Sequence, residues 1–280
     1  MTIDKSNLAK LKKFADVFKA ARERNANESD TVMYLVKFFE EVLSYDPLSG
    51  EITKEVPVKE RYCDFAIVLD NSKGEESKPE FLVEAKAAGV KSLNAKHIEQ
   101  ASNYAANRGV NWVVLTNGAS WHLYHLNFDK ETGINSELVF ELDILERLET
   151  EPDYVWDTLC VLAKSNVEEG GLETYYEQTK LLSPKTIVNT LVSEEVLMKI
   201  RQELNHHAPA RLDIKDVFRA VMHVLNPEAV AAAGDITPPV RRRRRRRRHQ
   251  ADEVEQPQTQ NSAPPPQIQP ESTDEEEIPR

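Results

Sequence analysis

Two short apolar runs with a helix-like stretch between them constrain the fold more than any other feature of this chain. The runs are "EFLVEAK" at 80–86 and "NWVVLTN" at 111–117. Between them, residues 93–107 have helical periodicity, and Gly109 follows as a stop signal. The strand–helix–strand order predicts a mixed sheet with helices packed on it, in the α/β class.

The remaining elements extend this pattern on both sides. Two amphipathic helices are expected first, one over residues 6–24 with Ser6 as its cap and one in "NESDTVMYLVKFFEEVL". From about 151 to 230 the periodicity is helical only. Strands are expected at 55–58, 61–69, 80–86, 111–116, 121–127 and 137–142. The predicted organisation is an α/β domain over 1–150, a helical extension over 151–232 and a disordered charged tail over 233–280.

Composition narrows the class of protein. The formal net charge is −11 although residues 241–248 are consecutive arginines, so the part before that run is acidic and does not indicate a nucleic-acid surface. The only cysteines, Cys63 and Cys160, form no CxxC motif and no disulfide framework, which is typical of a reducing compartment. Because there is no signal-peptide core and no apolar run long enough to span a bilayer, we expect a cytoplasmic protein without a membrane segment.

A pair of opposite charges ends the strand expected at 80–86. Side chains alternate along a strand, so Glu84 and Lys86 share one face, opposite Val83 and Ala85. Buried charge is costly unless it is paired or binds a metal. The pair is therefore either a structural ion pair or part of a site.

The preceding strand carries a third charge among apolar neighbours. In "RYCDFAIVLD", Asp64 is expected on one face, and Cys63 and Phe65 on the other. Two inward carboxylates, Asp64 and Glu84, can hold one Mg²⁺, which prefers oxygen ligands and keeps several waters. Lys86 beside them can orient a water or neutralise charge developing on a phosphate.

The helix expected after this strand adds two polar residues. In "AKHIEQASNYAANRG", Gln100 and Tyr104 lie at i and i+4 on one face. They are either two exposed residues of a surface helix or part of the same site.

These short motifs together resemble one family. Asp64, "EAK" at 84–86, "QASNYA" at 100–105 and "VLTNGASWHLY" at 114–124 are similar to the N-terminal nuclease domain of type I restriction enzyme R subunits, in the PD-(D/E)xK superfamily. The resemblance implies a restriction-endonuclease-like core and a Mg²⁺-dependent DNA endonuclease. It implies that Asp64, Glu84 and Lys86 are the catalytic core, with Asp64 and Glu84 as metal ligands, and that Gln100 and Tyr104 support the lysine and contact DNA. "TNG" at 116–118 and Trp121 match a signature that we interpret as structural.

A further acid is suggested by "NE" before the second helix. The resemblance indicates Glu28, which helical spacing aligns with Val32, Leu35 and Phe39 and hence with the core, whereas Glu41 lies on a more polar row. The alternative is that Glu28 only complements the helix dipole.

Two departures from the family pattern are visible. Cys63 stands where a proline is common, and the chain contains no GxxxxGK[ST] phosphate loop, so neither ATP binding nor a helicase motor is expected.

The arginine run allows three interpretations. It is a nucleic-acid arm acting through phosphate contacts, which we prefer, or it pairs with the acidic "STDEEE" in the same chain, or it is a low-complexity expansion. The run consists of Arg241, Arg242, Arg243, Arg244, Arg245, Arg246, Arg247 and Arg248.

The expected function is Mg²⁺-dependent hydrolysis of DNA phosphodiesters, in defence against foreign DNA as the resemblance implies. The alternative is a catalytically inactive module that keeps the fold and binds nucleic acid or protein. The expected partner is DNA, and a second protein that delivers DNA is a further possible partner.

Overall fold

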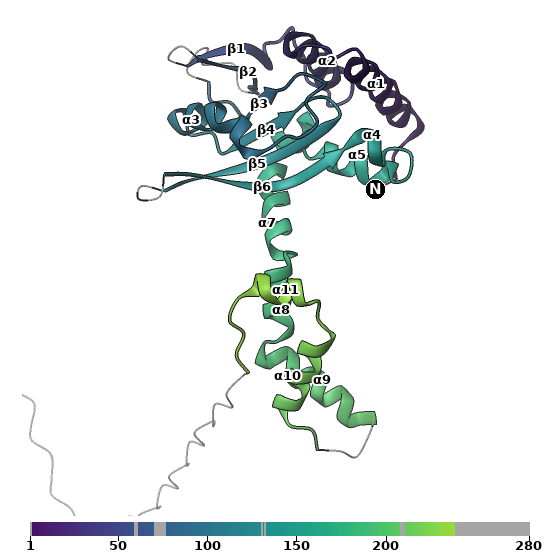
Figure 1. The fold of residues 1–280 in the computed structure, drawn as a ribbon, viewed down its shortest axis with the longest axis vertical. Coiled ribbons are helices and arrows are strands. Elements are labelled where there is room, and N and C mark those ends of the chain that lie inside the picture. The colour runs from purple at the N-terminus through teal and green to yellow at the C-terminus, as the bar shows by residue number, and fades with distance from the viewer. Residues whose placement is uncertain are drawn as a thin grey trace, which may run out of the picture. The chain divides into compact units, whose positions relative to one another are not determined.

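A six-stranded mixed sheet forms the centre of the α/β part in the computed structural model (Figure 1). The structure describes residues 2–58, 61–69, 77–129, 131, 133–207 and 211–238. The strands lie in chain order across the sheet. They are β1 (Ile52–Val58), β2 (Arg61–Ile67), β3 (Phe81–Ala85), β4 (Trp112–Thr116), β5 (Ser120–Asp129) and β6 (Gly133–Asp143).

One parallel pair interrupts the antiparallel order. β3 and β4 run parallel, with Glu84 opposite Leu115, and all other neighbouring strands are antiparallel. The crossover between them contains a 3-10 turn, η2 (Ala95–Ile98), and helix α3 (Glu99–Arg108). The predicted strand–helix–strand unit and the mixed sheet are confirmed.

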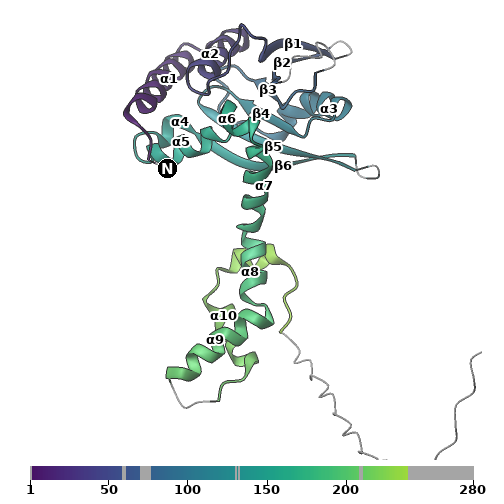
Figure 2. The ribbon, with the colours of Figure 1, turned by 180° about the vertical axis from the view of Figure 1, so that it is seen from behind.

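Helices cover both faces of the sheet. On one face, α1 (Lys5–Glu23) and α2 (Glu28–Glu41) lie side by side (Figure 1, Figure 2) and bury Phe18 and Phe38 against Trp121 and Val83. On the other face, α3 packs its small residues onto a second cluster that includes Leu82 and Leu115. The strand carrying Glu84 is thus buried from both sides.

One predicted helix signal is confirmed, and one is wrong. Gly109 ends α3 in the left-handed region (φ 65°), as predicted. The cap of α1 is Asp4 rather than Ser6, because the Asp4 carboxylate accepts hydrogen bonds from the backbone N–H groups of Ser6 and Asn7. Ser6 lies two residues later, inside the first turn of the helix.

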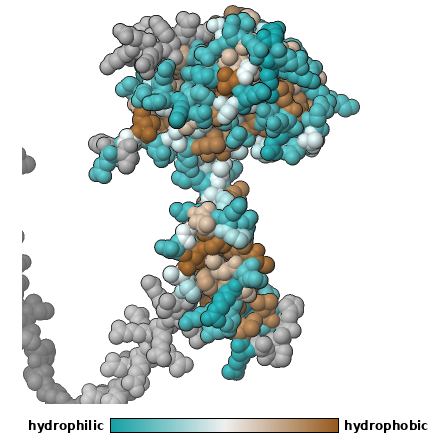
Figure 3. Space-filling model, in the orientation of Figure 1, coloured by the Kyte–Doolittle hydropathy of each residue, from teal (hydrophilic) through white to brown (hydrophobic). Residues whose placement is uncertain are grey.

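Helices alone follow β6 in the described residues. The first of them connect to the sheet: Trp112 Nε1 donates to Glu173 at 2.7 Å, and the rings of His125 and Tyr176 stack with centroids 4.1 Å apart. Among the last four, α9 and α10 pack together around Leu197 and Phe218, and apolar side chains also lie on the surface of this part (Figure 3). These helices are α4 (Ile144–Arg147), α5 (Pro152–Cys160), α6 (Lys164–Glu168), α7 (Gly171–Leu181), α8 (Pro184–Leu191), α9 (Glu194–His207), α10 (Ile214–Val224) and α11 (Pro227–Ala233).

The predicted division into domains stays a prediction. The described residues fall within one compact unit. The expected tail and the arginines at 241–248 fall almost entirely outside the described residues. No helix in the described ranges is both long and apolar enough to cross a membrane.

A candidate carboxylate–lysine site

Asp64 lies where the pairing of β2 with β3 ends. The last backbone pair of the two strands joins Phe65 and Val83. Beyond it, the Asp64 carboxylate accepts a hydrogen bond from the backbone N–H of Ala85 at 2.7 Å. The side chain thus replaces the next backbone hydrogen bond between the two strands. This bond fixes Asp64 beside the end of β3.

The expected face of Cys63 is wrong. Cys63 packs in the α3-side cluster with Ala66 and Leu82 rather than with Phe65, and its thiol contacts the carbonyl of Val83 at 3.2 Å. The regular alternation of side-chain direction along β2 is interrupted next to Asp64, where the Asp64 side chain rather than the backbone bonds to β3.

Glu84 and Lys86 form a close ion pair at the end of β3. Lys86 Nζ lies 2.6 Å from Glu84 Oε1, and Glu84 is only 6% exposed. The second carboxylate oxygen, Glu84 Oε2, is buried and has no hydrogen-bond partner among the described residues. The backbone N–H of Lys86 bonds to Thr116 O at 2.8 Å, which holds the lysine at the β3–β4 edge.

Glu28 approaches the same lysine from α2. Its Oε2 lies 3.6 Å from Lys86 Nζ, and its side chain is 48% exposed. The expectation that Glu28 faces the core is therefore wrong: it is the first residue of α2, ahead of the buried stripe that begins at Thr31. Glu41, at the other end of the helix, pairs with Lys13 at 2.5 Å.

These side chains open into one cavity of about 490 Å³. Gln100 is among its lining residues, as the sequence predicted. Tyr104 is not among them, because its side chain is buried in the cluster between α3 and the sheet. The cavity is lined by Glu28, Asp64, Glu84, Lys86, Lys96, His97, Glu99, Gln100 and Asn103.

Four of these residues were not predicted. Lys96, His97, Glu99 and Asn103 come from η2 and α3. The signal for three of them was present in the sequence: positions 96, 99, 100 and 103 form a polar stripe at helical spacing beside the buried one. His97 does not belong to this stripe, so the sequence gave no signal for it. In the structure its Nδ1 accepts the backbone N–H of Asn94 at 3.2 Å in a capping box.

Burial changes the charge balance of the site. It raises the pKa of Glu84 to about 7, against the lowering effect of Lys86. It also raises the pKa of Asp64 to about 6, against the hydrogen bond from Ala85. Burial lowers the pKa of Lys86, but the hydrogen bond and charge of Glu84 outweigh it, so this pKa lies above its ordinary value. Near neutral pH the lysine is charged and Glu84 is close to its titration point.

The turn after β4 has a structural role consistent with our interpretation of "TNG". Asn117 is fully buried; its Oδ1 accepts from Ala119 and Ser120, and its Nδ2 donates to Val90 O at 2.6 Å. Trp121 Nε1 donates to Gly118 O at 2.8 Å. These bonds hold the loop after Lys86 against the β4–β5 turn.

The fold and site together define a mixed α/β domain with two carboxylates and a lysine at the end of its buried strands. Residues 32–138 match a protein-family model, that of the type I restriction enzyme R protein N terminus (HSDR_N). The resemblance seen in the sequence is confirmed for this segment, which contains every predicted site residue of the α/β part except Glu28. No curated protein matches the chain, and no solved structure matches it.

Proposed function

We propose that the cavity is the active site of a Mg²⁺-dependent DNA endonuclease of the PD-(D/E)xK type. The observation that carries the proposal is the convergence of Asp64, Glu84 and Lys86, which lie on two strands, in one open cavity. A match to a restriction enzyme's N-terminal domain supports DNA as the substrate class. Defence against foreign DNA is part of the same proposal.

The side chains present fit a magnesium ion. In the described part of the chain, no three His, Cys, Asp or Glu side chains are grouped so as to hold a metal by themselves. Mg²⁺, however, is commonly held by one or two carboxylates together with waters and substrate phosphates. The buried, unpartnered Oε2 of Glu84 is an oxygen that a cation would satisfy, and Asp64 lies beside it. When bound, Mg²⁺ would activate a water and neutralise charge on the phosphate.

The chain's own residues then have separable roles. Asp64 and Glu84 would hold the metal through their carboxylates. Lys86 stabilises negative charge that develops on the phosphate, which requires that it leave its 2.6 Å contact with Glu84 when substrate enters. Gln100, on the facing helix, is placed to hold Lys86 or a phosphate oxygen by a hydrogen bond.

A second candidate function rests on the same ion pair. Lys86 contacts Glu84 at 2.6 Å and Glu28 at 3.6 Å, so the site satisfies part of its own charge without a ligand. An inactive module that binds nucleic acid or protein through the retained fold would show this pairing permanently.

A plasmid-nicking assay separates the two candidates. We expect the wild type to nick supercoiled DNA with Mg²⁺ and not with EDTA. Asp64→Ala, Glu84→Ala and Lys86→Ala should each lower the rate at least about a hundredfold while remaining folded, because each removes a charge that stabilises the transition state. Lys37→Ala, which removes an exposed lysine paired with Glu40, is the matched control and should retain full activity. Equal activity of wild type and Lys86→Ala would show that any nuclease activity comes from another site. No activity in the wild type would favour the inactive binding module.

A further inference from the structure

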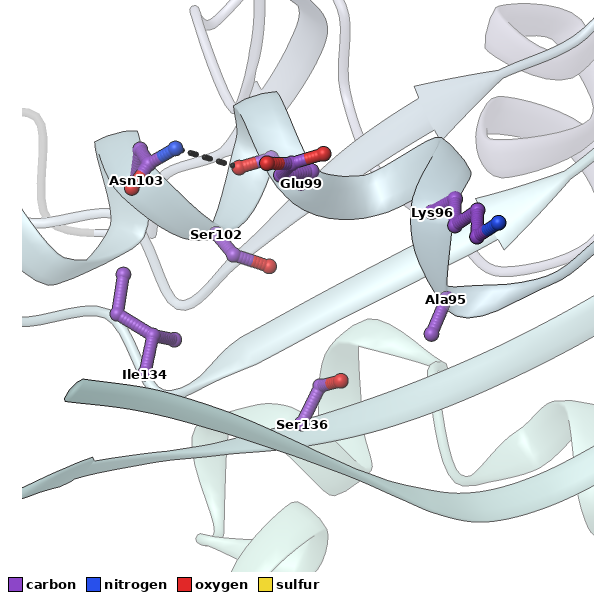
Figure 4. A pocket seen from close by; sticks show the side chains of 7 residues that line it. All are labelled: Ala95, Lys96, Glu99, Ser102, Asn103, Ile134 and Ser136. Atoms are coloured by element: carbon purple, nitrogen blue, oxygen red, sulfur yellow. Dashed lines mark hydrogen bonds between the residues drawn. The ribbon is translucent and has the colours of Figure 1, made fainter. Parts of the chain in front are cut away.

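A second hollow lies directly beside the candidate active site. It is a groove of about 420 Å³ between α3 and β6 (Figure 4). Lys96, Glu99 and Asn103 line both the groove and the cavity, so the two are separated only by the polar side chains of one helix face. A DNA strand bound in the cavity can therefore continue into the groove.

The lining has both polar and apolar parts. Ile134 and Ser136 extend from β6 toward η2 and α3, where Ala95 and Ser102 lie (Figure 4). Ala95 and Ile134 provide apolar surface, and the two serines provide hydroxyl groups that donate or accept. A flat heterocycle with hydrogen-bonding edges matches this combination better than a purely ionic ligand does.

Two hydrogen-bond acceptors of α3 belong to side chains that line the groove. Asn103 Nδ2 donates one of its two hydrogens to Glu99 O at 2.9 Å (Figure 4), and the Asn103 side chain still offers Oδ1 as an acceptor. The Glu99 carboxylate is a second acceptor in the same wall. Bases with an exocyclic amino group, such as cytosine and adenine, present donors to such acceptors.

The size and charge of the groove restrict the form of the nucleic acid. A volume of about 420 Å³ is that of a small-ligand site and does not admit a duplex. A base inside a duplex is stacked and paired, so it must be unpaired or flipped out before a pocket of this size can take it. Lys96, in the wall that the groove shares with the cavity, can contact the phosphate that links the bound base to the scissile position.

We propose that this groove binds one unpaired base of the DNA strand, next to the phosphate held in the cavity. This inference rests on the proposed function for the substrate and deepens it: the protein prefers DNA with an unpaired nucleotide beside the cleavage position. Because an amino-bearing base suits Glu99 and Asn103, cytosine should bind better than thymine.

Binding in the absence of cleavage tests the inference. The full chain is titrated in EDTA with a duplex that carries one unpaired cytosine and with the fully paired duplex, at a salt concentration that suppresses non-specific phosphate binding. The wild type should bind the duplex with the unpaired cytosine about tenfold more tightly, which is the gain in affinity expected from one well-placed base contact. Ser136→Trp, which fills the groove, and Ser136→Asp, which adds a negative charge without bulk, should both remove this preference.

The chain offers a matched control on the same strand. Asn135 is exposed and lies between Ile134 and Ser136 on the opposite face of β6, so Asn135→Trp should keep the preference. Equal wild-type affinity for the two duplexes, or a preference that survives in both Ser136 variants, would overturn the inference. Displacement of the DNA by an equal concentration of dCMP would also overturn it, because the site would then belong to free nucleotides. A preference that holds in a protein unable to nick plasmid would contradict the proposed function alone.

Discussion

At the scale of single residues, the site shows why charge in a buried strand is informative. Glu84 is nearly inaccessible, and one of its carboxylate oxygens has no partner in the described structure. A group in this position destabilises the folded chain when ionised, so its presence is better explained by a ligand than by stability.

Replacing Glu84 by glutamine should stabilise the protein at neutral and higher pH. The folded-state pKa of Glu84 is about 7, above its ordinary value of 4.5, so the folded state binds a proton more tightly than the unfolded state does. The wild type therefore loses stability as pH rises from about 4.5 to about 7. Glutamine resembles the protonated acid and removes this loss, so the free energy of unfolding of Glu84→Gln should exceed that of wild type by about 1–3 kcal/mol at pH 8.

Urea unfolding at pH 5 and pH 8 measures this effect. The difference between variant and wild type should shrink toward pH 5. Glu41→Gln, at an exposed pair with Lys13, is the control and should change stability by less than about 0.5 kcal/mol at either pH. A glutamine variant less stable than wild type at pH 8 would show that the Glu84–Lys86 pair stabilises the fold.

At the scale of elements, the sequence predicted the framework and missed what depends on tertiary contacts. The six strands and the crossover follow from periodicity, because buried runs such as Phe81–Ala85 leave little alternative. β5 and β6 each extend beyond their predicted ends, to Asp129 and back to Gly133, since the two strands satisfy each other's backbone where side chains are exposed. The same limit applies to the site: Asp64, Glu84 and Lys86 could be predicted, whereas the contact of Glu28 with Lys86 depends on where α2 packs.

The turn between β4 and β5 should tolerate no side chain at Gly118. Its φ is 90°, and a Cβ there would lie 2.4 Å from the Phe18 ring of α1. Gly118→Ala combines backbone strain with a clash in the core, so we expect a loss of about 2–4 kcal/mol in the free energy of unfolding.

Gly133→Ala separates the two causes of this loss. Gly133 has a similar φ of 80°, but a Cβ there would meet nothing within 4 Å. Its replacement should cost only about 1 kcal/mol, the strain alone. Chemical denaturation of the two variants gives both values, and equal losses would mean that the Phe18 contact contributes nothing.

At the scale of the whole molecule, charge is divided between the body and the end of the chain. The body is acidic, and its proposed active site is rich in carboxylates, while residues 241–248 carry eight positive charges. An acidic body binds DNA poorly by long-range attraction. Under the proposed function, we therefore expect DNA to be brought to the site by another source of positive charge, either the arginine run or a partner protein.

Deleting residues 241–248 should weaken DNA binding without changing its sequence preference. Phosphate contacts carry no base identity, and each phosphate neutralised on a duplex steepens the log–log dependence of affinity on salt by about 0.9. The deletion should flatten that slope, and removing the acids at 271–277 should tighten binding at low salt. Titrations of unrelated duplexes across a salt series measure both effects, and identical slopes for wild type and deletion would exclude a nucleic-acid arm.

The parallel pairing of β3 with β4 also has a consequence for the order of folding. β4, β5 and β6 follow one another through short turns, so their contacts are local and close rapidly. β3 joins β4 only after the crossover through α3 has closed, and closing a longer loop costs more chain entropy. We therefore expect the parallel β3–β4 pairing to form after the antiparallel pairs on either side of it. Asp64, Glu84 and Lys86 come before that crossover, whereas Lys96 and Gln100 lie within it, so the cavity of the candidate site gains its last lining residues only when the crossover closes.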